Sequence, residues 1–150
     1  MLDMYVDKIH NAHIYDLAFE SAIIPDPTIS SLLRNEILIK REDLQSVFSF
    51  KVRGAYNKLL NLSKEQLDRG VIAASAGNHA QGVAQAANKM QVEATIVMPT
   101  TTPQIKVDAV RQRGAQVVLV GDDFDAAAAY DPLRRRPTEA AGCLLYTSDA

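Results

Sequence analysis

Two short stretches of the sequence carry side chains that could do chemistry, and the first contains a lysine. In "SFKVRGA", residues 49–55, Lys51 stands between Phe50 and Val52. A lysine amine held among apolar groups is a candidate nucleophile toward carbonyl carbons. The same residue could be an ordinary surface lysine whose stem lies along Phe50 while its charge stays in water. Taken alone, the stretch favours the surface interpretation, because most lysines are solvated.

The second stretch is "SAGNHAQG", residues 75–82, which follows an apolar run and opens a helical pattern. A turn of small residues at a helix start exposes backbone N–H groups at the positive end of the helix dipole, so it can hold a carboxylate or phosphate. Ser75 and Gly77 leave room for such an anion, and Asn78 and His79 add donors. The spacing is neither the dinucleotide fingerprint nor the P-loop. A glycine turn with an asparagine cap and no ligand is the equal alternative.

The elements that would position these residues alternate between short apolar runs and helical patterns. We predict strands and helices in turn at residues 71–75, 78–90, 93–98, 103–113, 117–120 and 122–130. Thr102 is the expected cap of the middle helix, and Gly114 lies just beyond its end. This alternation predicts an α/β fold with a parallel sheet flanked by helices. In such sheets ligands bind beyond the carboxyl ends of the strands.

The part of the chain before the sheet is less regular. We predict an amphipathic helix over residues 3–19, a loop at "IIPDPTIS" and a short strand at residues 36–40. A helix follows over residues 50–62, with Ser49 as its cap. This places the candidate reactive lysine in a first helical turn.

Composition excludes several classes of protein. The 150 residues suffice for one domain with its own core. Sixteen basic and eighteen acidic residues are scattered, so we expect no nucleic-acid partner. No run resembles a signal peptide or a membrane span, and the single cysteine, Cys143, suits a reducing compartment. We therefore expect a cytoplasmic protein with no membrane partner. His10 and His13 share a helix face but lack further ligands, so we expect no metal.

Residues 131–150 break the alternating pattern. They contain a triple arginine, two prolines and no periodic apolar face. A disordered tail is one interpretation of that composition. We favour out-of-frame or foreign sequence, because the α/β pattern stops in the middle of a unit.

Taken together, the two chemical stretches indicate a family. "VFSFKVRGAYNKL" followed by "ASAGNHAQGVA" resembles the fold type II pyridoxal-phosphate enzymes of the tryptophan synthase β type, and most closely the biosynthetic threonine dehydratases. The likeness continues through "ILIKRED" and "IVMPTTTPQIKVDAVRQRGAQVVLVGDDFDAA" to about residue 129. It implies that residues 1–130 are the N-terminal part of a two-domain catalytic unit, with residues 131–150 outside it.

The resemblance also implies roles for particular residues. Lys51 is expected to form the Schiff base with pyridoxal 5'-phosphate, Asn78 to hydrogen-bond the cofactor's ring hydroxyl, and Phe50 to lie against the cofactor. The residues expected to bind the substrate carboxylate, through backbone amides, are Ser75, Ala76, Gly77, Asn78 and His79.

The implied reaction is deamination of L-threonine to 2-oxobutanoate and ammonia, the first step of isoleucine biosynthesis. L-Serine would give pyruvate by the same route, and the full-length enzyme is expected to be a homotetramer. A serine/threonine dehydratase or serine racemase of the same family stays open, as does a non-catalytic anion-binding α/β module.

Two departures from the family pattern limit what the chain can do. Ser46 stands where relatives usually carry proline, which affects loop stiffness more than chemistry. The family's glycine-rich phosphate loop, the group that faces the pyridine nitrogen and the C-terminal regulatory domain lie beyond the matching region. We therefore expect the 150 residues alone to be inactive.

Overall fold

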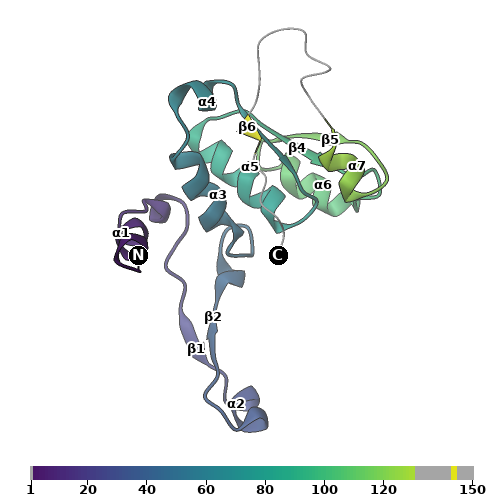
Figure 1. Cartoon of the computed structure of the whole chain (residues 1–150). Helices are drawn as coiled ribbons and strands as arrows, with labels where there is room; N and C mark the ends of the chain where they lie inside the picture. Colours follow the sequence, from purple (N-terminus) through teal and green to yellow (C-terminus); the bar gives the residue numbers. More distant parts are fainter. Residues whose placement is uncertain (1, 131–142, 145–150) are drawn as a thin grey trace.

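A parallel sheet forms the centre of the fold. The computed structural model describes residues 2–130 and 143–144 (Figure 1). The strands are β3 (Val71–Ala74), β4 (Ala94–Met98), β5 (Gln116–Leu119) and β6 (Cys143–Leu144). Their order is β5-β4-β3-β6, and every pairing is parallel. The predicted α/β class with a parallel sheet flanked by helices is confirmed.

The helices between these strands cover the sheet. They are α5 (Asn78–Met90), α6 (Gln104–Arg111) and α7 (Phe124–Ala128). The predicted span of α5 is correct at both ends, and α6 and α7 lie within their predicted ranges. Small residues on α5 let it pack closely, and Ala80, Val83 and Ala87 are almost fully buried against the apolar strands. The main core therefore combines the strands with the buried faces of α5, α6 and α3 (Lys51–Leu60).

The helix predicted over residues 3–19 is wrong in length. It is divided into α1 (Leu2–His10) and a 3-10 turn, η1 (Ile14–Asp16). After the break the chain turns so that Ala18 is buried beside Val47 and Val52. The side chains of residues 3–10 in α1 are exposed, and a continuous helix would have kept that spacing. Burial of the later residues therefore accompanies the early end of the helix.

The predicted loop at "IIPDPTIS" is also wrong. It forms β1 (Ile23–Pro25) and the start of α2 (Pro27–Leu33). Asp26 accepts a hydrogen bond from the Ile29 amide at 2.9 Å, and Pro27 occupies the first turn, so the residues that resemble a loop are a helix start. The predicted strand is confirmed as β2 (Leu38–Lys40), antiparallel to β1. This ribbon and α2 extend away from the sheet (Figure 1).

The next elements connect the ribbon to the sheet. They are a 3-10 turn, η2 (Glu42–Leu44), and the helices α3 (Lys51–Leu60) and α4 (Lys64–Asp68). The predicted helix is confirmed as α3, but its predicted cap is wrong. Phe50 is the N-cap residue, and the buried Ser49 hydroxyl has no hydrogen-bond partner among the described residues, because it faces inward rather than toward the helix start. The predicted cap of α6 is also wrong. Its N-cap residue is Pro103, and the Thr102 hydroxyl is buried without a hydrogen-bond partner among the described residues.

None of the helices in the described part of the chain combines the length and the apolar character that crossing a membrane requires.

Candidate active site

The candidate site is built around the contact between α3 and α5. A Cβ atom placed on Gly82 of α5 would lie 3.1 Å from both the carbonyl carbon and the carbonyl oxygen of Lys51, and 3.3 Å from the amide nitrogen of Val52. The first turn of α3 therefore rests on α5 backbone to backbone. Asn78 is four residues before Gly82, so the two share a face of α5 about 6 Å apart along its axis. The fold thus brings the lysine stretch to the start of α5.

Lys51 is half-buried at the start of α3. Its Nζ lies 5.7 Å from the centroid of the Phe50 ring, within the range of a cation–π contact. The Phe50 side chain itself is 59% exposed. An amine and a flat apolar surface are therefore presented side by side.

Residues 75–79, which the sequence predicts to bind an anion and which we call the anion loop, lie where β3 ends and α5 begins. The Ser75 amide donates to the Val97 carbonyl at 3.0 Å, and the Ser75 hydroxyl accepts from the Gly77 amide at 3.3 Å. Gly77 is the N-cap of α5, and a Cβ there would meet nothing within 4 Å. Ser75 therefore joins the start of the loop to β4 and to Gly77, and the space next to the Gly77 Cα is open.

The two polar residues that open α5 point in different directions. Asn78 is exposed, whereas His79 is 5% exposed. Ala76 is half-buried between them and the strand. The amide side chain of Asn78 is therefore available to a ligand, while any part played by His79 in binding passes through its backbone amide.

A polar network that sequence reasoning missed fixes the other side of α3. Arg53 donates to both carboxylate oxygens of Glu42, at 2.8 and 2.9 Å, and to the Phe19 carbonyl at 2.9 Å. The Ser21 hydroxyl also donates to Glu42, at 2.5 Å. The side chain of Gln45, which is 1% exposed, pairs with the backbone N–H and C=O of Phe19. Three distant segments are thus joined two residues beyond Lys51.

This network changes the electrostatics of its members. The pKa of the Glu42 carboxyl lies below its ordinary value, mainly because Arg53 donates to it, with a smaller contribution from Ser21 against the effect of burial. The same pair raises the pKa of Arg53. Both side chains are less than a fifth exposed, so water screens this ion pair far less than a surface pair.

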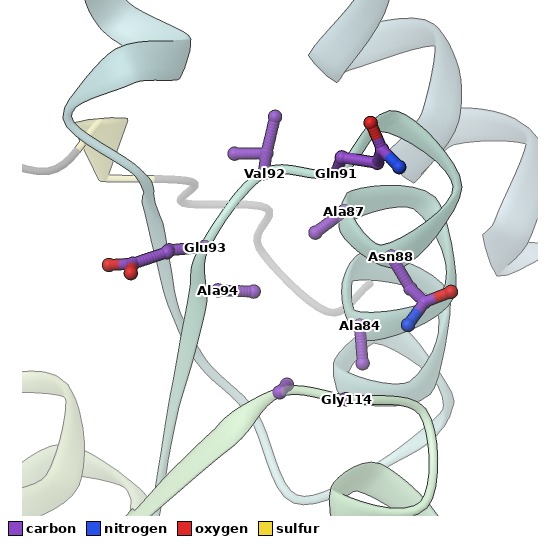
Figure 2. A pocket seen from close by; sticks show the side chains of 9 residues that line it. Ala84, Ala87, Asn88, Gln91, Val92, Glu93, Ala94 and Gly114 are labelled. Carbon is purple, nitrogen blue, oxygen red and sulfur yellow. The ribbon is translucent and has the colours of Figure 1, made fainter.

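A surface pocket lies at the opposite end of α5. Figure 2 shows it between the last turns of α5 and the starts of β4 and β5, with Ala84, Asn88, Glu93 and Gly114 among its lining residues. Asn88 is ten residues after Asn78, which places it about 15 Å further along the helix. The pocket is therefore separate from the lysine and the anion loop, which lie at the carboxyl edge of the sheet where α/β proteins bind ligands.

The fold and the site together define an α/β protein in which the lysine-bearing turn of α3 packs on α5 near its uncapped start, at the carboxyl edge of a parallel sheet. The chain belongs to the pyridoxal-phosphate dependent enzyme family, whose profile matches residues 14–146.

Individual relatives within this family are more specific. The chain is 53% identical, over 126 residues, to the biosynthetic chloroplastic threonine dehydratase 1 of Solanum lycopersicum, and the match covers 84% of this chain and 21% of that protein. The solved structure of the processed form of threonine deaminase isoform 2 from the same plant has a TM-score of 0.87 and 49% identity, with 97% of this chain and 39% of that chain covered. Maize serine racemase has a TM-score of 0.84 at 28% identity, with 94% and 43% covered.

The chain therefore spans about a fifth of the tomato dehydratase that it matches. Its own residues fit the family's cofactor. Phe50 offers an exposed ring beside the Lys51 amine, and the space above Gly77 leaves the start of α5 accessible to a bound group.

The Glu42–Arg53 pair predicts a pH-dependent stability. Glu42→Gln is expected to lower the free energy of unfolding by about 1–3 kcal/mol near neutral pH, because it removes a charged acceptor from a half-buried network. A carboxyl with a lowered folded pKa contributes stability above its unfolded pKa of about 4.3 and loses it as pH falls through the folded value. The difference between parent and variant should therefore shrink below about pH 4.3. Urea unfolding from about pH 3 to about pH 7 measures it.

Asp43→Asn is the matched control, because Asp43 is the residue next to Glu42 and also pairs with an arginine, Arg41, but its side chain is exposed. Its effect on stability should be much smaller than that of Glu42→Gln. An equal effect of the two substitutions, or a Glu42 effect that does not change with pH, would contradict the assigned role of the network.

Proposed function

We propose that this chain is the N-terminal part of a pyridoxal-phosphate-dependent lyase that deaminates L-threonine to 2-oxobutanoate and ammonia, with L-serine as a second substrate. The observation that carries the proposal is the contact of the Lys51 backbone with Gly82, which packs the lysine-bearing turn of α3 on the helix that Asn78 opens. The identity of 53% to a threonine dehydratase supports the choice of substrate.

The residues of this chain would divide the work as follows. Lys51 would attach the cofactor through Nζ and, once substrate has displaced it, take the proton from the substrate Cα. Bound pyridoxal phosphate supplies an electron-accepting ring that stabilises the charge left on that carbon. Asn78 would orient the ring through its exposed amide, and Phe50 would lie against it.

The substrate would be held by its carboxylate. The first amides of α5 meet no side-chain cap, since Gly77 occupies the N-cap position, so they can donate to an anion at the positive end of the helix dipole. Ser75 and Ala76 would shape the approach, and His79 would contribute its backbone amide. Loss of the β-hydroxyl of L-threonine as water and later uptake of one water balance the overall reaction.

The two alternatives have less support. The serine racemase of maize shares the fold, but its identity to this chain is 28%, against 49% for the tomato deaminase structure. A non-catalytic anion-binding module would need no exposed ring beside its lysine, and this chain has one at Phe50. Two measurements separate the dehydratase, the racemase and the non-catalytic module: the identity of the product, and covalent labelling of Lys51 by the cofactor.

The wider setting of the protein is part of the same proposal. The word biosynthetic in the name of the tomato relative supports a place at the start of isoleucine biosynthesis. We propose a cytoplasmic homotetramer for the full-length enzyme, although the tomato relative is named chloroplastic. We also propose that residues 1–130 are the N-terminal part of the catalytic domain. The disordered or out-of-frame tail proposed for residues 131–150 lies outside the described residues, apart from Cys143 and Leu144 of β6. The family match extends to residue 146.

A completed enzyme provides the test of the Lys51 assignment. In it, residues 1–129 of this chain replace the matching part of the tomato dehydratase. Borohydride reduction with bound cofactor should fix the pyridoxyl group on Lys51, and Lys51→Ala should lower 2-oxobutanoate release from L-threonine at least about a thousandfold, because the covalent attachment is lost. Peptide mapping and a product assay measure both. A label on Lys40, Lys58 or Lys106 would overturn the assignment.

Asn78→Ala in the completed enzyme should weaken cofactor binding by about tenfold, which is the loss of one hydrogen bond to the ring. Absorbance titration with pyridoxal phosphate measures the affinity. Asn88→Ala is the control, because Asn88 is an exposed asparagine of the same helix but lies beside the distant pocket. Unchanged affinity in Asn78→Ala would mean that this residue serves only the helix start.

The 150-residue chain by itself should release no measurable 2-oxobutanoate from L-threonine, even with pyridoxal phosphate in excess. Lys51 and Asn78 would contact only part of the cofactor. When the groups of an active site act as a unit, the absence of some of them lowers activity by far more than their share of the contacts. The assay compares the chain with its Lys51→Ala variant. Robust turnover by the first and none by the second would show a complete active site within these residues.

A further inference from the structure

Gly82 is an unusual residue for its position. It lies in the interior of α5, where its neighbours include Ala80, Ala84 and Ala86, and glycine destabilises a helix interior relative to alanine. A glycine inside a helical pattern therefore calls for a packing or functional reason.

The reason is the backbone of α3. The atoms that a Gly82 Cβ would meet, at 3.1 to 3.3 Å, belong to the main chain of Lys51 and Val52. A flexible side chain could swing away from such a contact, but a helix backbone can yield only if α3 shifts by a few tenths of an ångström. The shift would move Lys51 directly, since its own carbonyl is the group displaced.

α3 cannot yield freely, because its far side is held. Val52 is fully buried in a small cluster with Ala18 and Val47. Arg53 is fixed by its two hydrogen bonds to Glu42. A side chain at position 82 would therefore press the first turn of α3 against a packed and hydrogen-bonded neighbour.

We propose that Gly82 is a positioning residue for the Lys51 amine: the absence of a side chain there sets the separation between the first turn of α3 and the face of α5 that carries Asn78. The proposal rests on the proposed function, which gives Lys51 and Asn78 a shared ligand. Groups that act on one ligand must be held to within about 0.5 Å, so a shift of a few tenths of an ångström at Lys51 is large enough to matter.

Gly54 of α3, the helix that carries Lys51, gives a matched control. It lies three residues after Lys51, and a Cβ there would meet nothing within 4 Å. Gly54→Ala and Gly82→Ala therefore make the same chemical change at two glycines near Lys51, one in open space and one against the lysine backbone.

The experiment uses the completed enzyme with pyridoxal phosphate. For each variant, circular dichroism establishes the folded state, and the absorbance of the bound cofactor is titrated with pH, which reports the lysine linkage without substrate. We expect Gly82→Ala to shift the midpoint of this titration and to lower kcat for L-threonine about tenfold or more, with KM changed less. Gly54→Ala should keep the midpoint and stay within about twofold of the parent kcat.

A folded Gly82→Ala variant with the parent midpoint and kcat would overturn the proposal. If Gly82→Ala does not fold, Val52→Ala decides, because it loosens the packing on the far side of α3 without adding a contact at position 82. A shifted midpoint in Val52→Ala then supports the proposal, and the parent midpoint overturns it.

The parent enzyme separates this inference from the proposed function. If it binds pyridoxal phosphate at Lys51 but releases no 2-oxobutanoate, the threonine assignment fails. The comparison of cofactor titrations for Gly82 and Gly54 still decides the positioning role, since it needs no substrate.

Discussion

The structure depends on one close approach between two helix backbones. The first turn of α3 rests on α5 where Gly82 has no side chain, and this contact joins a lysine to a helix start that follows it by 27 positions in the sequence. Backbone contacts tolerate little adjustment, because no rotamer change can relieve them. The geometry of the candidate site is therefore set by the fold of the main chain, and the side chains of Lys51 and Asn78 only extend from it.

The polar network on the far side of α3 makes that approach rigid. Glu42 and Arg53 pair with each other, and Arg53 and Gln45 both hydrogen-bond the backbone of Phe19. The segment after η1, the turn η2 and the start of α3 are therefore tied together. Charged hydrogen bonds in a partly buried setting contribute more than exposed pairs, since both screening and competition from water are reduced. The segment around Phe19 and Ser21 thus supports the helix that carries the lysine.

The same scaffold serves more than one chemistry. A tomato threonine deaminase and a maize serine racemase match this chain with similar TM-scores, 0.87 and 0.84, so the fold does not select between elimination and racemisation. Function resides in the groups grafted on the fold. The proposed dehydration therefore rests on the higher sequence identity and on the named residues around Lys51, not on the architecture.

The sequence by itself determined the order of strands and helices from Val71 to Ala128, because burial periodicity is a local property. It singled out Lys51 and Asn78 as candidates only through the resemblance of two separate stretches to one family. It could not show that Ser49 faces inward or that "IIPDPTIS" forms a strand and a helix start, since those outcomes depend on distant packing partners. The role of Gly82 had a local signal, a glycine inside a helix, but its partner could not be read from the chain. Only the tertiary structure decided that this partner is Lys51, because a contact between residues 31 positions apart exists only once both helices are packed.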